Sequence, residues 1–134
     1  MPAFSIYLAD KLLDHTFRNT AYTSPATVYV SLYTAISDAE AGTGTEVTGG
    51  SYARVAVTFG APADNSGVRE IKNSAKVDFG TATASWGTVT HFGIFDASSA
   101  GNALAELTAL TVSKLVNNGD PVEFAVDSLV LTLD

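Results

Sequence analysis

Residues 86–97 read WGTVTHFGIFDA, and this stretch decides the fold. Its β-branched and aromatic residues favour an extended strand, and an Asp-led turn closes it. Most of its apolar bulk lies at even positions, as in a half-buried strand, until Phe95 beside Ile94 breaks the alternation. Gly93 is a candidate for a β-bulge at that break. The stretch contains neither a nucleophile–base pair nor metal-ligand spacing, so we interpret it as architectural.

Strand patterns continue on both sides of this stretch. The segments that alternate apolar and polar residues, or that are short and rich in β-branched residues, are 28–33, 52–59, 68–71, 75–79, 103–107, 110–116, 122–126 and 129–133. Residues 117–120 read Asn-Asn-Gly-Asp and predict a hairpin turn, because Asn-Gly readily adopts positive φ angles. The change of parity at residues 127–128 predicts a bulge or a strand crossing between sheets.

One helix is predicted near the N-terminus, over about residues 5–20, with Ser5 as its N-cap. Apolar residues at spacings of three and four form a stripe along it, which consists of Ile6, Ala9, Leu13 and Phe17 and is widened by Leu8 and Leu12. A single amphipathic helix cannot bury such a stripe alone. We therefore expect Leu13 and Phe17 to pack on the rest of the domain or on a neighbouring subunit.

Residues 34–50 are small and polar and include several glycines, so we expect a long flexible loop here. In a larger assembly such a loop would be an arm that a partner orders. Asp38, Glu40 and Glu46 offer hard oxygen ligands for calcium. Their spacing lacks the regular acidic pattern of a calcium loop, so a solvated loop without a metal is the preferred interpretation.

Together these patterns predict a mainly β fold: a single-domain β-sandwich over residues 1–134, of jelly-roll or Greek-key type, with one N-terminal helix. The length favours one domain, because two domains would each be too small to bury a core. Hydrophobic residues make up 46% of the chain and charged residues only 16%, a balance that indicates a folded protein.

The charge distribution argues against nucleic-acid and membrane partners. The 7 Lys and Arg residues are scattered among 14 Asp and Glu residues, and the net charge of −7 offers no basic patch for phosphates. No apolar run approaches the length of a membrane span, and no signal peptide is visible, so we expect synthesis in the cytoplasm. The absence of cysteine excludes disulfides, thiolate metal sites and a Cys nucleophile.

Enzymatic chemistry and a cofactor are not expected. A catalytic histidine needs an orienting carboxylate and a nucleophile, and the only acidic residue near His91 in the sequence is Asp96. A structural or interface role for His91 is therefore preferred. Sugar binding is an alternative that would need an aromatic platform, for which the chain offers Trp86, Tyr29, Tyr33 and Tyr52. Aromatic residues on strands more often belong to a core or an interface.

Two blocks of the chain resemble short structural proteins of tailed bacteriophages. Residues 86–96 match a WGTVTHxGIFD core, and residues 49–54 match an upstream GGxYAR block. The resemblance extends to the N-terminal helix and the C-terminal hairpin. It implies a virion protein of the head-decoration or tail-fibre kind, and it carries over no catalytic residues. The candidate structural or interface residues of the two blocks are Tyr52, Arg54, Trp86, His91 and Asp96. We expect Arg54 to form an ion pair with Asp96.

The leading hypothesis is a capsid decoration, or cement, protein on the outer capsid surface of the virion. It would bind the major capsid protein of the assembled shell as a homo-oligomer, with a trimer favoured, and stabilise the shell by the contacts it adds. The first alternative is a tail-tip or tail-fibre component that contacts a host surface glycan. A third hypothesis, of another class, is a free carbohydrate-binding or hydrolytic module.

Overall fold

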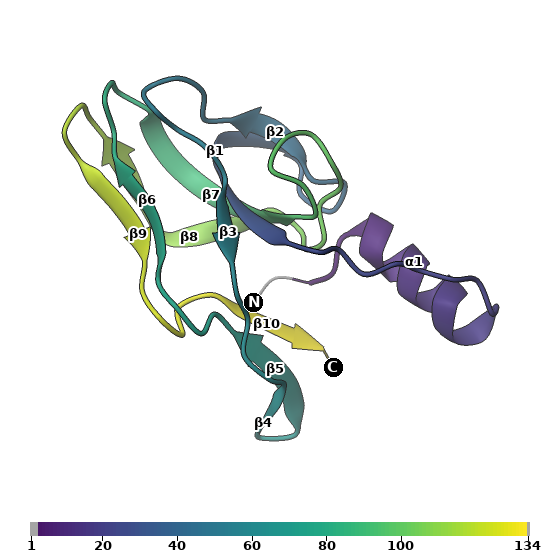
Figure 1. Ribbon diagram of the computed structural model, residues 1–134. Helices are drawn as coiled ribbons and strands as arrows, with labels where there is room; N and C mark the ends of the chain where they lie inside the picture. The colour runs from purple at the N-terminus through teal and green to yellow at the C-terminus, as the bar shows by residue number, and fades with distance from the viewer. Residues whose placement is uncertain (1–2, 134) are drawn as a thin grey trace.

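The computed structural model describes residues 3–133 and has the architecture of a β-sandwich preceded by one helix (Figure 1). In chain order the elements are α1 (Ile6–Phe17), β1 (Val28–Asp38), β2 (Thr43–Glu46), β3 (Val55–Val57), β4 (Ala63–Asn65), β5 (Val68–Lys72), β6 (Val77–Thr81), β7 (Gly87–Phe95), β8 (Thr108–Val116), β9 (Pro121–Phe124) and β10 (Val130–Leu133). The prediction of a mainly β fold with an N-terminal helix is confirmed.

Three antiparallel sheets make up the β structure. The largest has the strand order β2-β1-β7-β8, with β3 also paired to β1; a second has the order β10-β5-β4; β6 and β9 form a two-stranded ribbon. Strand β7, the stretch quoted first, lies in the middle of the largest sheet. It pairs with β1 in a register that runs from Tyr29 opposite Phe95 to Tyr33 opposite His91.

The core lies between the large sheet and the β6–β9 ribbon. The ring of Phe92 on β7 contacts the ring of Phe124 on β9 edge to face, with centroids 5.6 Å apart. Phe124 in turn contacts Phe79 on β6 at 6.2 Å. A second, smaller cluster contains Tyr33, Phe95, Ala103 and Leu107. Phe95 breaks the alternation of its strand because its side chain belongs to this second cluster, whereas that of Ile94 belongs to the main one.

The predicted bulge at Gly93 is wrong, because β7 pairs with β1 through Gly93 without a register shift. The irregularity lies instead between Val89 and His91, where residues 110–113 of β8 lie opposite Thr90 of β7, so the extra residues belong to β8. Val89 is buried before this shift, and all of residues 92–95 are buried after it. Gly93 has a different role. A Cβ atom there would lie 2.7 Å from Leu107 and 2.8 Å from Ser31, so only glycine allows this close approach.

The predicted loop at residues 34–50 is wrong for most of its length. Strand β1 continues to Asp38, and β2 pairs back on it, so the segment contains a β-hairpin. Gly42, with φ +73°, allows the turn. The residues are small and polar because most of this hairpin is exposed, and backbone pairing does not require apolar side chains.

Two predictions about the second half of the chain are corrected in part. The turn at residues 117–120 exists, with Gly119 at φ +93°, but it joins β8 to β9, which lie in different sheets, so it is not a hairpin turn. Residues 103–107 make isolated bridges rather than a strand. The crossing predicted at residues 127–128 is confirmed, because β9 pairs with β6 whereas β10 pairs with β5.

Helix α1 begins at the predicted cap. The Ser5 hydroxyl accepts a hydrogen bond from the Leu8 amide at 3.1 Å, and the helix ends at Phe17. The helix projects from the sandwich, and the chain then returns along residues 18–27 to β1 (Figure 1). None of its residues is buried. No helix within residues 3–133 has the length and apolar character needed to cross a membrane.

Candidate functional site

A tightly connected polar network is centred on Arg54, whose side chain is only 6% exposed. Its guanidinium binds Glu46 of β2 in a bidentate manner, with Nη2 2.8 Å from Oε1 and Nε 2.9 Å from Oε2. The predicted ion pair between Arg54 and Asp96 is therefore wrong. The true partner lies in the segment that the sequence analysis interpreted as a loop, and its role was missed for that reason.

The same guanidinium also holds the turn after β7. Its Nη1 donates to the carbonyl oxygens of Ala97 at 3.0 Å and Ala100 at 2.8 Å, and the group lies 4.1 Å from the centre of the Phe95 ring. Asp96 closes this turn from within, because its carboxylate accepts hydrogen bonds from the amide and the side chain of Asn102. Arg54 and Asp96 thus stabilise one turn without touching each other as an ion pair.

Tyr52 completes the network. Its hydroxyl donates to Glu46 Oε2 at 2.7 Å and accepts from the Leu32 amide at 3.0 Å. Burial raises the pKa of Tyr52 well above its ordinary value, so the hydroxyl remains a donor. Burial also raises the pKa of Glu46, but the hydrogen bonds from Arg54 and Tyr52 outweigh this effect and hold that pKa below its ordinary value. The hydrogen bond to Glu46 raises the pKa of Arg54.

Trp86 connects the network to the start of β7. Its side chain is 5% exposed, its ring meets the Tyr52 ring edge to face at 5.5 Å, and its Nε1 donates to the Gly50 carbonyl at 3.0 Å. A Cβ atom on Gly50 would lie 2.7 Å from this Nε1, which explains the glycine. The blocks at 49–54 and 86–96 are therefore in contact with each other. Their distinctive residues form internal structure.

The arrangement does not favour a sugar platform built from the predicted aromatic residues. Trp86 and Tyr33 are 5% and 3% exposed, so their faces are covered by protein. The Tyr52 ring lies between those of Phe79 and Trp86. Tyr29 lies in β1 opposite Phe95.

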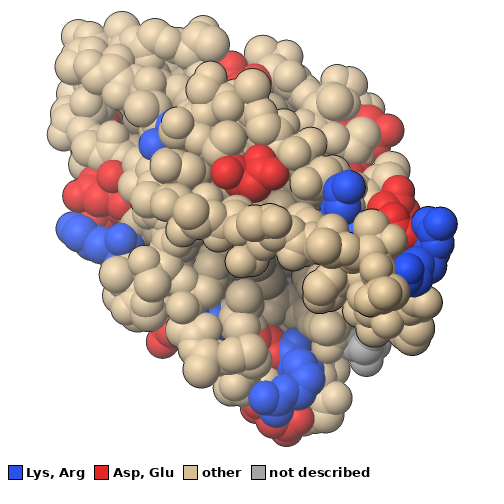
Figure 2. Space-filling model, turned by 45° about the vertical axis from the view of Figure 1, so that its right-hand side comes forward, with Lys and Arg blue, Asp and Glu red and all other residues tan. Residues whose placement is uncertain are grey.

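His91 and the acidic residues of the hairpin are also engaged locally. The Nδ1 atom of His91 lies 2.8 Å from the Thr90 hydroxyl. The Asp38 carboxylate accepts a hydrogen bond from the Ala41 amide, and Glu46 binds Arg54. Within residues 3–133 the structure contains no group of three His, Asp or Glu residues arranged to hold a metal ion. Figure 2 shows acidic and basic side chains dispersed over one face of the molecule.

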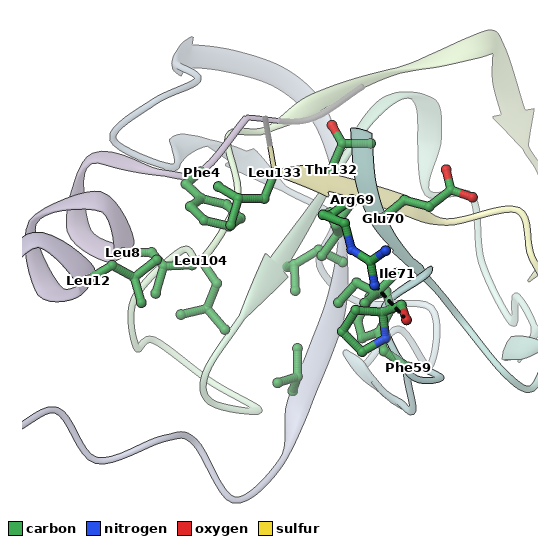
Figure 3. A pocket seen from close by; sticks show the side chains of 14 residues that line it. Phe4, Leu8, Leu12, Phe59, Arg69, Glu70, Ile71, Leu104, Thr132 and Leu133 are labelled. Atoms are coloured by element: carbon green, nitrogen blue, oxygen red, sulfur yellow. Dashed lines mark hydrogen bonds between the residues drawn. The ribbon is translucent and has the colours of Figure 1, made fainter. Parts of the chain in front are cut away.

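Leu13 and Phe17, in contrast, are not engaged. Leu13 is 57% exposed and Phe17 is 79% exposed. The sequence predicted that they pack either on their own domain or on a neighbouring subunit, and these exposures contradict packing on their own domain. The opposite side of α1 lines an apolar groove of about 380 Å³ (Figure 3). Its lining residues come from α1 and the segment before it, from β1, β5, β7 and β10, and from the segments that follow β3 and β7. This groove and the exposed side of α1 are apolar surfaces that are open to a partner.

Comparison with known proteins agrees with a structural role. Residues 3–132 match the family described as podophage GP4 fiber I protein gp80. None of the curated proteins shows significant similarity to the chain. The matched residues include α1, all of the sheets and both of the blocks described above.

Proposed function

The chain belongs to the podophage GP4 fiber I protein gp80 family, and we propose that it is a structural subunit of a phage tail fibre, without enzymatic activity. The match over residues 3–132 carries this proposal. It places the chain among phage structural proteins and gives the tail-fibre alternative of the sequence analysis more weight than capsid decoration. The subunit would act through protein–protein contacts, with further copies of itself and with other virion proteins.

The distribution of polar and apolar groups supports this function. The best-organised polar side chains, those of Arg54, Glu46 and Tyr52, are used to fix one turn against the sheet. The exposed apolar residues Leu13 and Phe17 lie on a helix that projects from the sandwich. A scaffold whose charged network is used internally, and which carries an apolar projection, is suited to assembly.

The experiment that tests this function measures where the chain lies in purified virions, and in what amount. Quantitative mass spectrometry gives its copy number relative to the major capsid protein. A tail fibre predicts a copy number that is a small fraction of that of the capsid protein. A copy number comparable with that of the capsid protein would contradict the fibre assignment and support the capsid decoration predicted from the sequence, on the outer capsid surface.

Immunogold labelling gives the location independently. An epitope can be inserted at the exposed turn after β4, where Gly67 has no neighbouring atoms within 4 Å of an added Cβ. We expect gold particles at the tail and not around the head. Virions that carry the untagged chain are the control for nonspecific labelling.

A further inference from the structure

Helix α1 has two apolar sides, and only one of them faces its own domain. Leu8 and Leu12 line the groove. Ile6, Leu13 and Phe17 are 49%, 57% and 79% exposed. Helical periodicity places these three residues on the side opposite Leu8 and Leu12. We call them the outer stripe.

The outer stripe needs a covering surface. A helix of 12 residues is marginally stable on its own in water, and α1 buries none of its residues in its own domain. Burial of a Leu or Phe side chain removes a large apolar area from water, so covering Leu13 and Phe17 would stabilise the helix.

The groove has the properties of such a surface. Leu8 and Leu12 of α1 line it, together with Ile71 of β5 and Leu133 of β10 (Figure 3). Leu104 points into it from the chain after β7. With about 380 Å³ of space and an open mouth, the groove can admit large apolar side chains. Leu133, on its rim, is 57% exposed.

The occupant of the groove cannot be the outer stripe of the same molecule, because the opposite side of the same helix forms a wall of that groove. The charges indicate a second copy of the chain. Arg69 and Glu70 both line the groove, but Glu70 is paired with Lys72. Asp10 lies on α1 beside the outer stripe. Among the ion pairs of residues 3–133, neither Arg69 nor Asp10 takes part. Docking the stripe of one copy into the groove of another would bring these opposite charges together.

We propose that the outer stripe of α1 inserts into the apolar groove of a second copy of this chain. The contact is head to tail, because each copy uses its stripe on one neighbour and its groove on the other. Such a contact closes into a ring, such as the favoured trimer, or extends into a filament. It deepens the proposed function and rests on it for the choice of a second copy, since a fibre subunit works in contact with its own kind.

Engineered disulfides test the contact directly, because the natural chain contains no cysteine. The variant that carries both Phe17→Cys and Leu133→Cys is expected to form disulfide-linked dimers and larger species on oxidation. A reductant should convert all of these species back to single chains. The matched control carries Val112→Cys with Leu133→Cys, because Val112 is 78% exposed on β8, outside the groove and the stripe. Absence of linked species from the first pair would overturn the proposal. Equal linkage by Phe17→Cys alone would also overturn it, since it would mean that two stripes meet.

Light scattering on the purified full chain measures the same contact without a cross-link. We expect a mass of at least twice the 13.9 kDa of one chain, and a shift to the monomer in Phe17→Asp but not in Val112→Asp. Arg69→Asp should weaken association, and Arg69→Asp combined with Asp10→Arg should restore it. Circular dichroism verifies that each variant folds.

If the natural chain is monomeric at all concentrations, the proposed contact between copies is wrong, even if virions carry the chain at the tail. If the chain associates as described but lies on the capsid, the proposed fibre function is wrong and the proposed contact between copies stands.

Discussion

At the scale of single residues, the arrangement around Arg54 depends on the shape of the guanidinium group. Three of its nitrogens donate to Glu46 and to two carbonyl oxygens of the turn after β7, while its plane covers the Phe95 ring. A lysine has one point charge and cannot make this set of contacts. Removing one partner of a buried ion pair costs about 3–5 kcal/mol, because the other partner is left buried without compensation.

The pH dependence of stability should reveal the contribution of Glu46. Its pKa is lower in the folded chain than its ordinary value, so its contribution is complete above about pH 4.3 and is lost as the pH falls through the folded-state pKa. At pH 7 we expect Glu46→Gln to lower the free energy of unfolding by about 3 kcal/mol. The difference from the natural chain should shrink below about pH 4. Denaturant unfolding at a series of pH values measures it.

The matched control for this experiment is Glu40→Gln. Glu40 is exposed, and no ion pair within residues 3–133 includes it. Its substitution should change the free energy of unfolding by less than about 0.5 kcal/mol at each pH. If Glu46→Gln is equally harmless at pH 7, the ion pair with Arg54 does not stabilise the fold.

At the scale of elements, the local signals in the sequence were sufficient for some features and not for others. The cap and spacing of α1 and the composition of β7 are properties of neighbouring residues, and both elements were predicted. The hairpin of β1 and β2 depends on backbone pairing between small polar residues, which leaves no apolar pattern. The partner of Arg54 lies on that hairpin, so missing the strand also meant missing Glu46. Which strands pair, and where the register between β7 and β8 shifts, is decided by distant segments.

The start of α1 offers a test at this scale. Ser5 is 1% exposed; its hydroxyl caps the helix and also donates to the Ala103 carbonyl. Ser5→Ala removes both hydrogen bonds, so we expect the free energy of unfolding to fall by about 2 kcal/mol. Circular dichroism and denaturant unfolding measure the loss of helix and of stability. Ser113→Ala, on the exposed part of β8, is the control and should be close to neutral. A neutral Ser5→Ala would show that the helix does not depend on this cap.

At the scale of the whole molecule, short turns hold the separate sheets together. The turn at residues 117–120 carries the chain from the edge of the large sheet to the β6–β9 ribbon. The Asp120 carboxylate accepts from the Asn117 amide, and the Gly119 amide donates to the Ala82 carbonyl at 2.7 Å. Because each sheet covers the core of the other, strain in this turn should affect the stability of the entire domain.

Gly119→Ala tests this dependence. Gly119 has φ +93° and no atoms within 4 Å of an added Cβ, so the substitution adds backbone strain without a clash. We expect it to lower the free energy of unfolding by about 1–2 kcal/mol in a single cooperative transition. Gly60→Ala is the matched control, because Gly60 has room for a Cβ and is not in the left-handed region. A loss equal to that of Gly60→Ala would contradict the role given to the turn.

The position of β1 has a mechanical consequence. The chain leaves α1 and runs through residues 18–27 directly into β1, which is flanked by β7 on one edge and by β2 and β3 on the other. A pull on the C-terminal end of the helix therefore reaches the domain through β1, which has paired strands on both edges. Traction along that strand loads many of its ladder hydrogen bonds together in shear, whereas a pull on an edge strand would peel them apart one after another. The projecting helix is thus a point at which tension can be applied to the domain without breaking its strand pairs one hydrogen bond at a time.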